Sequence, residues 1–262
     1  MSNKLSERIL SYQAAADLRL LPRIPLVIVI NGRSFSKLTS LLDKPYSSGF
    51  AECIMSTMLR LCTDVEGAMF AYQHNDEIVV IARNDQSTES LPWFENRVQK
   101  ISSITASIAT LHFNKCATAI ELNLMSEPMF ACQTFVVPNI VEAINTLVCK
   151  QQNNFHTSIQ SACFYELLKK YDKNTIKEML NGLSIDERID LLRQECGVDF
   201  NQYPMSFRRG SACYRIPKVT EDGKMKNKWF VNAELPIFTK DTSFLSNLFK
   251  HDGIDIFRQE NL

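Results

Sequence analysis

The chain has 262 residues, of which 45% are apolar, so it can bury a sizeable hydrophobic core. This composition excludes an intrinsically disordered chain. Basic residues (Lys and Arg) number 29 and acidic residues (Asp and Glu) also number 29. The formal net charge is therefore zero, which excludes a global cationic field that would attract nucleic acid, so any RNA contact must be local.

The cysteines and the N-terminus indicate the compartment. Eight cysteines are spread along the chain, with no C-x-x-C pair and no Cys/His cluster at zinc-ligand spacing. We therefore expect reduced thiols in a cytoplasmic protein. The N-terminus has mixed charge, and no apolar run is long enough for a membrane span, so we expect a soluble protein without a membrane anchor.

The first predicted elements are a helix and a buried strand. Apolar residues occur near helical spacing over residues 5–20, which predicts an N-terminal helix. Pro22 and Pro25 then interrupt the chain before the apolar run LVIVI at residues 26–30. Because this run is short and rich in β-branched residues, it predicts a strand that is buried on both faces.

A helix and a hairpin are predicted next. The segments at residues 68–72 and 78–82 are typical of short strands, and the polar residues 73–77, QHNDE, separate them as the acidic tip of a β-hairpin. The helix before this hairpin has an apolar stripe of about four turns. The stripe consists of Phe50, Ile54, Met58 and Leu61.

A second helix is predicted from Pro92, and a strand follows at residues 130–137, where Pro138 ends it. The resulting order, β-α-β-β-α-β, is that of the ferredoxin-like fold, which polymerases use as their palm. In this topology the first and third strands are antiparallel neighbours, so Asn31 should lie beside Asp76 and Glu77. The expected apolar stripe of the second helix consists of Phe94, Val98, Ile101, Ile108 and Leu111.

The remainder of the chain predicts additions to this core. Residues 139–180 are largely helical in pattern, and residues 206–240 are rich in strand formers, with Asp222 and Gly223 as a hairpin turn. The predicted fold class is therefore α+β: a ferredoxin-like polymerase palm with helical and β-hairpin C-terminal additions. Residues 1–138 would form the palm-like catalytic core with its N-terminal helix, and residues 139–262 would complete a single compact unit.

Two short segments could carry chemistry. Residues 31–36, NGRSFS, form a turn after a buried strand, where a glycine lets backbone amides approach a phosphate. Residues 75–77, NDE, place acids at the hairpin tip. Either segment alone is more often structural. Together they lie at two adjacent strand ends, where a palm uses carboxylates to hold a pair of Mg²⁺ ions that share a triphosphate.

The same segments carry a family resemblance. VINGRSFSK at residues 29–37 resembles the motif R-I-D-G-R-x-F-H-K/R, and AYQHNDE at residues 71–77 resembles A-Y-x-Q-S-D-E. Lys44-Pro45, between these two segments, lies where the family often has K-P. Further resemblances come later in the chain: QQ at 151–152, ACFY at 162–165, GVDFN at 197–201, RRGS at 208–211 and ELPIFTKD at 234–241. In these features the chain resembles the tRNA(His) guanylyltransferase family, and most closely its bacterial-type 3′-5′ polymerases.

The resemblance implies a nucleotidyltransferase that adds nucleotides in the 3′-to-5′ direction to the 5′ end of tRNA or another 5′-monophosphorylated RNA. It implies ATP and GTP as substrates, two Mg²⁺ ions as cofactors, and a homotetramer or homodimer. Catalytic roles fall on Asn31, Asp76 and Glu77, and metal ligands on Asn31, Gly32 and Asp76. Nucleotide contacts fall on Gly32, Arg33, Ser34, Phe35, Ser36, Lys37, Lys44, Asn75 and Arg188.

The main departure from the family pattern is Asn31, because the family has an aspartate there. Two unit charges about 4 Å apart interact by roughly 4 kcal/mol at an effective dielectric constant of 20, so the missing charge should weaken a metal site and lower activity. Three explanations stay open: an engineered change, natural loss of catalysis, or chemistry that depends on Glu77. Ser36 in place of a histidine, and residues 130–133, FACQ, in place of F-D-S-R, are further departures.

Other features leave the substrate and the activity open. Residues 155–159, FHTSI, replace the H-I-N-N segment of eukaryotic members, so repair of truncated 5′ ends is an alternative to tRNA(His)-specific addition, and we expect His156 to be a half-buried helix residue. A basic cluster is either an RNA-backbone surface or a solvated hairpin face. A palm that binds nucleotide or RNA without turnover, and a nucleotide-sensing domain, are the alternative functions. The cluster consists of Arg208, Arg209, Arg215, Lys218, Lys224, Lys226 and Lys228, with Tyr214 and Trp229 interleaved.

Overall fold

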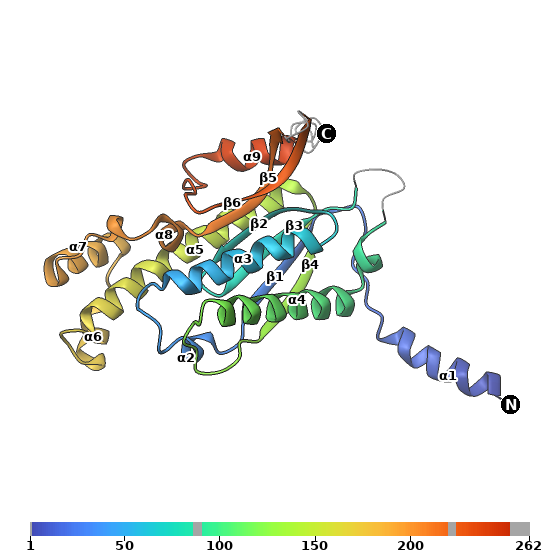
Figure 1. Cartoon of the computed structure of the whole chain (residues 1–262), viewed down its shortest axis with the longest axis horizontal. Helices are drawn as coiled ribbons and strands as arrows, with labels where there is room; N and C mark the ends of the chain where they lie inside the picture. Colours follow the sequence, from blue (N-terminus) through green and yellow to red (C-terminus); the bar gives the residue numbers. More distant parts are fainter. Residues whose placement is uncertain (1, 86–90, 220–223, 252–262) are drawn as a thin grey trace.

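A six-stranded antiparallel sheet forms the centre of the computed structural model, which describes residues 2–85, 91–219 and 224–251 (Figure 1). The strand order is β4-β1-β3-β2-β5-β6. Strands β1 to β4 and the helices between them follow the predicted order β-α-β-β-α-β along the chain, so the palm-like fold is confirmed. The strands are β1 (Leu26–Gly32), β2 (Ala68–His74), β3 (Glu77–Ala82), β4 (Phe130–Val136), β5 (Ser211–Val219) and β6 (Met225–Asn232).

Helices cover both faces of this sheet (Figure 1). The helices α3 (Ser48–Asp64) and α4 (Val98–Ala119) pack on one face, and α5 (Ile140–Leu167) and α9 (Thr242–His251) pack on the other. The part of α5 that extends beyond the sheet carries α6 (Lys173–Leu180), α7 (Ile185–Cys196) and α8 (Met205–Arg209). No helix of the described ranges is both long and apolar enough to cross a bilayer.

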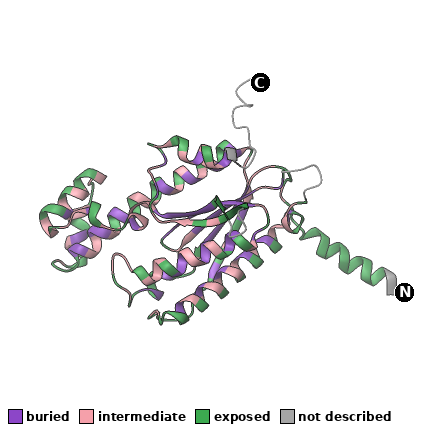
Figure 2. Cartoon of the chain, turned by 45° about the horizontal axis from the view of Figure 1, so that its top comes forward, coloured by how far each residue is buried: buried purple, intermediate pink, exposed green. Residues whose placement is uncertain are grey.

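The N-terminal helix stands apart from this body. The structure has a helix α1 at Ser2–Ala15, shorter than the predicted span of residues 5–20. It projects away from the sheet, and its described side chains are exposed (Figure 2). Apolar side chains such as Leu5, Leu10 and Tyr12 are therefore open to solvent in the single chain.

The strand β1 is buried on both faces, as its apolar run predicted. Ile28 and Ile30 belong to the core under α3 and α4, whereas Val27 and Val29 belong to the core under α5 and α9. This alternation follows from the pleat of a strand, in which successive side chains point to opposite faces. Asn31, the next residue after Ile30, therefore points toward the α5 side.

The predicted stripe of the second helix was wrong in part. Helix α4 begins at Val98, and Phe94 lies in a separate 3-10 turn, Trp93–Asn96. Leu111, which we expected in the core, is 59% exposed. The buried face instead includes Thr105, whose hydroxyl donates to the Ile101 carbonyl at 2.6 Å, so a satisfied polar residue holds a core position that hydrophobicity alone does not predict.

The hairpin tip is also tighter than predicted. Strands β2 and β3 continue to His74 and Glu77, which leaves a two-residue turn at Asn75 and Asp76, with Asn75 at φ 51°. Gln73 is buried in the sheet, and its Nε2 is satisfied there because it donates to Ser211 Oγ at 2.6 Å. The predicted turn at residues 222 and 223 lies outside the described residues.

Candidate active site

The ends of β1 and β3 lie side by side. Asn31 is the cross-strand partner of Glu77, and the Gly32 amide donates to the Asp76 carbonyl at 2.9 Å. The predicted adjacency of these two motifs is therefore confirmed. The loop after β1 and the turn before β3 form one hydrogen-bonded unit.

Packing fixes the loop after β1. A Cβ at position 32 would lie 2.3 Å from the Phe35 ring, so only glycine allows this approach. Phe35 is buried, with its ring centroid 5.0 Å from that of Phe130, and Ser34 adopts a left-handed conformation at φ 57°. The Arg33 amide donates to the Met129 carbonyl at 2.8 Å. This amide is therefore engaged within the protein, and the predicted phosphate contacts of the loop narrow to residues 34–36.

A cleft of about 430 Å³ lies beside these strand ends, within the range of about 300–1,000 Å³ that is usual for small-molecule sites. Most of the predicted nucleotide contacts line it, and so does Asp76. The opposite wall comes from α5, whose Thr157, Ser161 and Tyr165 recur every four residues. Sequence reasoning gave these three residues no role in the site, although their helical spacing was a signal. The predicted residues in the lining are Gly32, Ser34, Phe35, Ser36, Lys44, Asn75 and Asp76.

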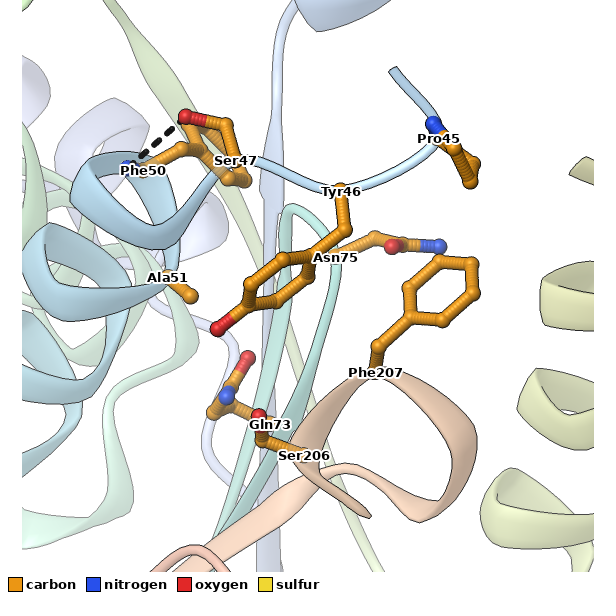
Figure 3. Close-up of a pocket in the computed structure, with 9 residues that line it drawn as sticks. All are labelled: Pro45, Tyr46, Ser47, Phe50, Ala51, Gln73, Asn75, Ser206 and Phe207. Atoms are coloured by element: carbon orange, nitrogen blue, oxygen red, sulfur yellow. Dashed lines mark hydrogen bonds between the residues drawn. The ribbon is translucent and has the colours of Figure 1, made fainter. Parts of the chain in front are cut away.

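A smaller pocket of about 50 Å³ adjoins the cleft and shares Pro45, Ser47, Phe50 and Asn75 with it (Figure 3). Ser47 Oγ accepts from the Phe50 amide at 3.4 Å and so caps the start of α3. The start of α3 therefore lies where the cleft and the smaller pocket meet.

Lys44 provides positive charge in the cleft. Its Nζ donates to Thr39 Oγ1 at 3.0 Å and lies 5.7 Å from the centroid of the Tyr165 ring. Burial lowers the Lys44 pKa, and within the described ranges its ammonium makes no ion pair with a carboxylate. An anion in the cleft would therefore meet a partly desolvated ammonium that forms no ion pair with a described carboxylate, while Asp43 and Asp76 line the same cleft.

Asp76 provides negative charge in the same cleft. Burial raises its pKa, and the nearby charge of Glu77 raises it further. In the described part of the chain, the Asp76 carboxylate makes no ion pair. A cation beside Asp76 would lower this pKa again, because an opposite charge favours the ionised form.

Glu77 faces α5 and does not line the cleft. Its Oε2 accepts from Lys150 Nζ at 2.6 Å. On the same face, His74 is buried and its Nε2 donates to the Phe207 carbonyl at 2.8 Å. Burial lowers the pKa of His74 to about 4, so this imidazole is neutral near pH 7.

The predicted nucleotide contacts do not all converge. Arg33 and Lys37 line a neighbouring groove of about 430 Å³ that also contains Glu127. Arg188 lies on α7, where its guanidinium donates to the carbonyls of Leu183 and Leu180. Arg188 therefore stabilises the connection between α6 and α7, and it does not line the cleft.

The predicted basic cluster does not form one surface. The Arg208 guanidinium donates to the Tyr203 carbonyl, and that of Arg209 donates to the Leu235 carbonyl, so both hold neighbouring backbone. Arg215 stacks over the Trp229 ring at 4.5 Å. The pleat places Lys218, Lys226 and Lys228 on the opposite face of the β5–β6 hairpin, with Lys218 directly across from Lys226. Lys224 is exposed just before β6.

On α5, His156 differs from expectation and Gln151 has a structural role that was not predicted. His156 is exposed and not half-buried, because it faces away from the sheet. Gln151 is buried; its Nε2 donates to the Arg209 and Pro236 carbonyls, and its Oε1 accepts from the Phe238 amide. Sequence reasoning gave Gln151 no role, although a polar residue repeated within a motif on an apolar helix face was the available signal.

The residues at the strand ends fit one Mg²⁺ ion better than two. Within the described ranges, no three His, Cys, Asp or Glu side chains are grouped closely enough to hold a metal. The Asp76 carboxylate and the Gly32 carbonyl are hard oxygen ligands of the kind that Mg²⁺ prefers. A second ion would depend on Asn31, which has no charge, and on Glu77, which Lys150 already engages.

Comparisons with known proteins agree with this geometry. The family profile described as tRNAHis guanylyltransferase matches residues 6–138. A probable tRNA(His) guanylyltransferase from Dictyostelium discoideum is 26% identical over 230 residues, which cover 86% of this chain and 87% of that protein. The tRNA(His) guanylyltransferase 1 of Arabidopsis thaliana is 24% identical over 217 residues, and the match covers 80% of this chain but 37% of that longer protein.

Solved structures match the fold. A bacterial tRNA(His) guanylyltransferase-like protein in complex with ATP superposes with a TM-score of 0.81 at 24% identity, over 93% of this chain and 98% of that chain. Its complex with GTP gives a TM-score of 0.74 at 23% identity, over 94% and 98% of the two chains. Because the matched profile spans the palm and both strand-end motifs, the chain belongs to the tRNA(His) guanylyltransferase family, which is a family of nucleotidyltransferases.

Proposed function

We propose that this chain adds nucleotides to the 5′ end of tRNA or another 5′-monophosphorylated RNA in the 3′-to-5′ direction, with ATP and GTP as substrates. The observation that supports this most is the junction of the two motifs. The Gly32 amide bonds to the Asp76 carbonyl at 2.9 Å, beside a cleft that contains Lys44. The matched family and the ATP and GTP complexes of a structural relative agree with it.

Each wall of the cleft has a part in this proposal. Lys44 would bind the triphosphate of ATP or GTP, because its charge is partly buried and not paired with a carboxylate in the described residues. Ser34 and Ser36, together with Thr157 and Ser161 on α5, would donate hydroxyl hydrogen bonds to phosphate or ribose oxygens. Asp76 and the Gly32 carbonyl would hold Mg²⁺, which when bound neutralises charge on the phosphates.

The exposed lysines of the β5–β6 hairpin are the proposed RNA-backbone contacts. Lys218 and Lys226 lie directly opposite each other, which is unfavourable for like charges unless an anion lies near them. Arg208 and Arg209 are set aside from this role because their guanidinium groups hold backbone carbonyls. An oligomer belongs to the same proposal, and the exposed apolar side chains of α1, among them Leu5 and Leu10, are consistent with one.

The activity is expected to be weak because of Asn31. Asn31 is exposed beside Glu77, so an aspartate would fit there without a packing change. An Asp there would restore one negative charge, worth roughly 4 kcal/mol to a unit charge about 4 Å away at an effective dielectric constant of 20. We therefore expect Asn31→Asp to raise the rate by at least about tenfold, the factor that corresponds to 1.36 kcal/mol.

The test is an incorporation assay. The protein is incubated with Mg²⁺, ATP, labelled GTP and 5′-monophosphorylated tRNA, in wild-type and Asn31→Asp forms. Label at the 5′ end, with more in the variant, is the expected result. If neither protein incorporates label with full-length or 5′-truncated tRNA, the proposed activity is wrong.

A second candidate function is nucleotide or RNA binding without turnover. The ion pair between Lys150 and Glu77 favours this candidate. Lys150 Nζ donates to Glu77 Oε2 at 2.6 Å and so engages a carboxylate that catalysis would use, while Asn31 supplies no charge. Calorimetry separates the two candidates. Micromolar binding of GTP or tRNA together with no incorporation, even by Asn31→Asp, would replace the transferase proposal with this one.

A further inference from the structure

A small charged group lies at the ends of β1 and β3 on the side that faces α5. It consists of Asn31, Glu77 and Lys150, and we call it the strand-end group. Lys150 Nζ donates to Glu77 Oε2 at 2.6 Å, with side-chain exposures of 28% and 22%. Because both partners are partly buried and the contact is short, this pair should hold its geometry better than an exposed ion pair.

Helix α5 sets the position of this charge. Lys150, Asn154 and Ser158 recur every four residues along the face of α5 that meets the strand ends. Asn154 donates to the Tyr72 hydroxyl at 3.3 Å, and Ser158 Oγ lies 2.7 Å from His74 Nε2. Of the three, only Lys150 carries a full charge, and it contacts the carboxylate that is the cross-strand partner of Asn31.

The charge balance of this group opposes a second divalent cation. The Lys150 ammonium already compensates the Glu77 carboxylate, and the amide of Asn31 contributes only a dipole. A divalent ion beside Glu77 would also lie next to the ammonium and be repelled by it. Asp76 faces the cleft, and its carboxylate makes no ion pair with a described residue, so no ammonium occupies the place of a cation there.

We propose that the Lys150 ammonium takes the place of a second divalent cation beside Glu77, so that each chain holds one Mg²⁺, on the Asp76 side. The inference rests on the proposed function, since it concerns the cations of the same site. Lys150 acts through Glu77 and is therefore a positioning residue. It fixes the Glu77 carboxylate and excludes a metal ion from that position.

The test counts bound metal without turnover. Mn²⁺ is titrated into the full chain with a non-hydrolysable GTP analogue, and free Mn²⁺ is measured by electron paramagnetic resonance. Wild type should bind one Mn²⁺ per chain. The double variant Asn31→Asp/Lys150→Gln should bind two, and in Asn31→Asp alone the second Mn²⁺ should bind at least tenfold more weakly than in the double variant.

Matched variants separate charge from structure. Lys169 makes an ion pair of the same 2.6 Å length with Glu166, just after α5 and far along the chain from the strand-end group. Lys169→Gln in the Asn31→Asp background should leave the affinity for the second Mn²⁺ unchanged. Lys150→Arg in that background keeps the charge, and it should keep the second Mn²⁺ weak.

Three results would overturn the inference. They are two Mn²⁺ per wild-type chain, no Mn²⁺ at all, or a second Mn²⁺ in Asn31→Asp whose affinity is the same with Lys, Arg or Gln at position 150. Because metal counting needs no RNA, these outcomes are independent of the incorporation assay. One Mn²⁺ per chain without incorporation would refute the transferase and leave this inference standing, whereas incorporation with two Mn²⁺ would do the reverse.

Discussion

Replacing Gln151 with leucine should destabilise the fold strongly, whereas the same change at its neighbour Gln152 should not. The Gln151 side chain is buried on α5 and bonds to three backbone groups from two separate segments. Its Nε2 donates to the Arg209 carbonyl at 3.3 Å and to the Pro236 carbonyl at 3.0 Å, and its Oε1 accepts from the Phe238 amide at 2.7 Å. Leucine has a similar volume but cannot satisfy any of these groups.

The magnitude follows from the number of broken contacts. A net contribution of about 1 kcal/mol per hydrogen bond gives a loss of about 3 kcal/mol in the free energy of unfolding. The Phe238 amide would lose its acceptor in the interior, and this desolvation cost means that the loss should not be much smaller than that. Gln152 is exposed, so Gln152→Leu should change stability by less than about 0.5 kcal/mol.

Urea unfolding of the two variants and wild type, followed by circular dichroism, measures the difference. We expect the free energy of unfolding to fall with urea concentration at the same slope in all three proteins, with a lower midpoint for Gln151→Leu. A Gln151→Leu protein within about 0.5 kcal/mol of wild type would show that these bonds do not hold the C-terminal segments to α5. The stabilising role that we assign to Gln151 would then be wrong.

Three other predictions concern single positions. Gly210→Ala should cost at least about 2 kcal/mol, because φ is +78° and a Cβ would lie 2.5 Å from the Gln73 carbonyl oxygen. Gly182→Ala, at φ +74° with nothing within 4 Å, should cost less in the same denaturation assay. The His74 pKa of about 4 lies below the ordinary 6.5, so the unfolded chain binds the proton first and stability falls as pH drops from 6.5 to 4. The loss in the free energy of unfolding approaches roughly 3 kcal/mol over this range. The variant His74→Gln should lack this pH dependence, and urea unfolding in EDTA at pH 4.5, 5.5 and 6.5 measures it. Lys44→Gln should raise the KM for ATP by about tenfold or more, whereas Lys37→Gln in the neighbouring groove should leave it nearly unchanged; equal effects would contradict the assigned cleft.

Elements that depend on local pattern were predictable from the sequence. The β-branched run at residues 26–30 gave a doubly buried strand, and the split topology then required its end to meet the start of β3. The register pairs Leu26 with Ala82 and Asn31 with Glu77, and a shift by one residue would exchange the two apolar sets of β1 between the two cores. The meeting of Asn31 and Glu77 follows from that register.

Polar residues whose partners lie far along the chain were not predictable in the same way. Gln73 and His74 read as loop residues, but their partners, Ser211 and Phe207, come from a segment more than a hundred residues later. A buried polar side chain is tolerated only where such a partner exists, and local sequence carries no sign of it. The hydrogen bond of Arg209 was not predictable for the same reason, since its guanidinium reaches a backbone carbonyl that only the folded chain brings near.

The motifs that resemble those of the family differ in their physical role, and this difference helps to interpret Asn31. Gln151, Arg209 and Gly210 join α5, β2 and β5 through buried hydrogen bonds and a close backbone approach, so a change at any of them would disturb the fold. Asn31 is exposed at a strand end and supports no such joint. Asn31→Asp should therefore leave the midpoint of unfolding nearly unchanged while it alters metal binding and nucleotide transfer. Because only charge changes in that comparison, a difference in activity between the two proteins would measure what a carboxylate at this position contributes. A large loss of stability in Asn31→Asp would instead mean that position 31, beside the Glu77 carboxylate, requires a neutral side chain.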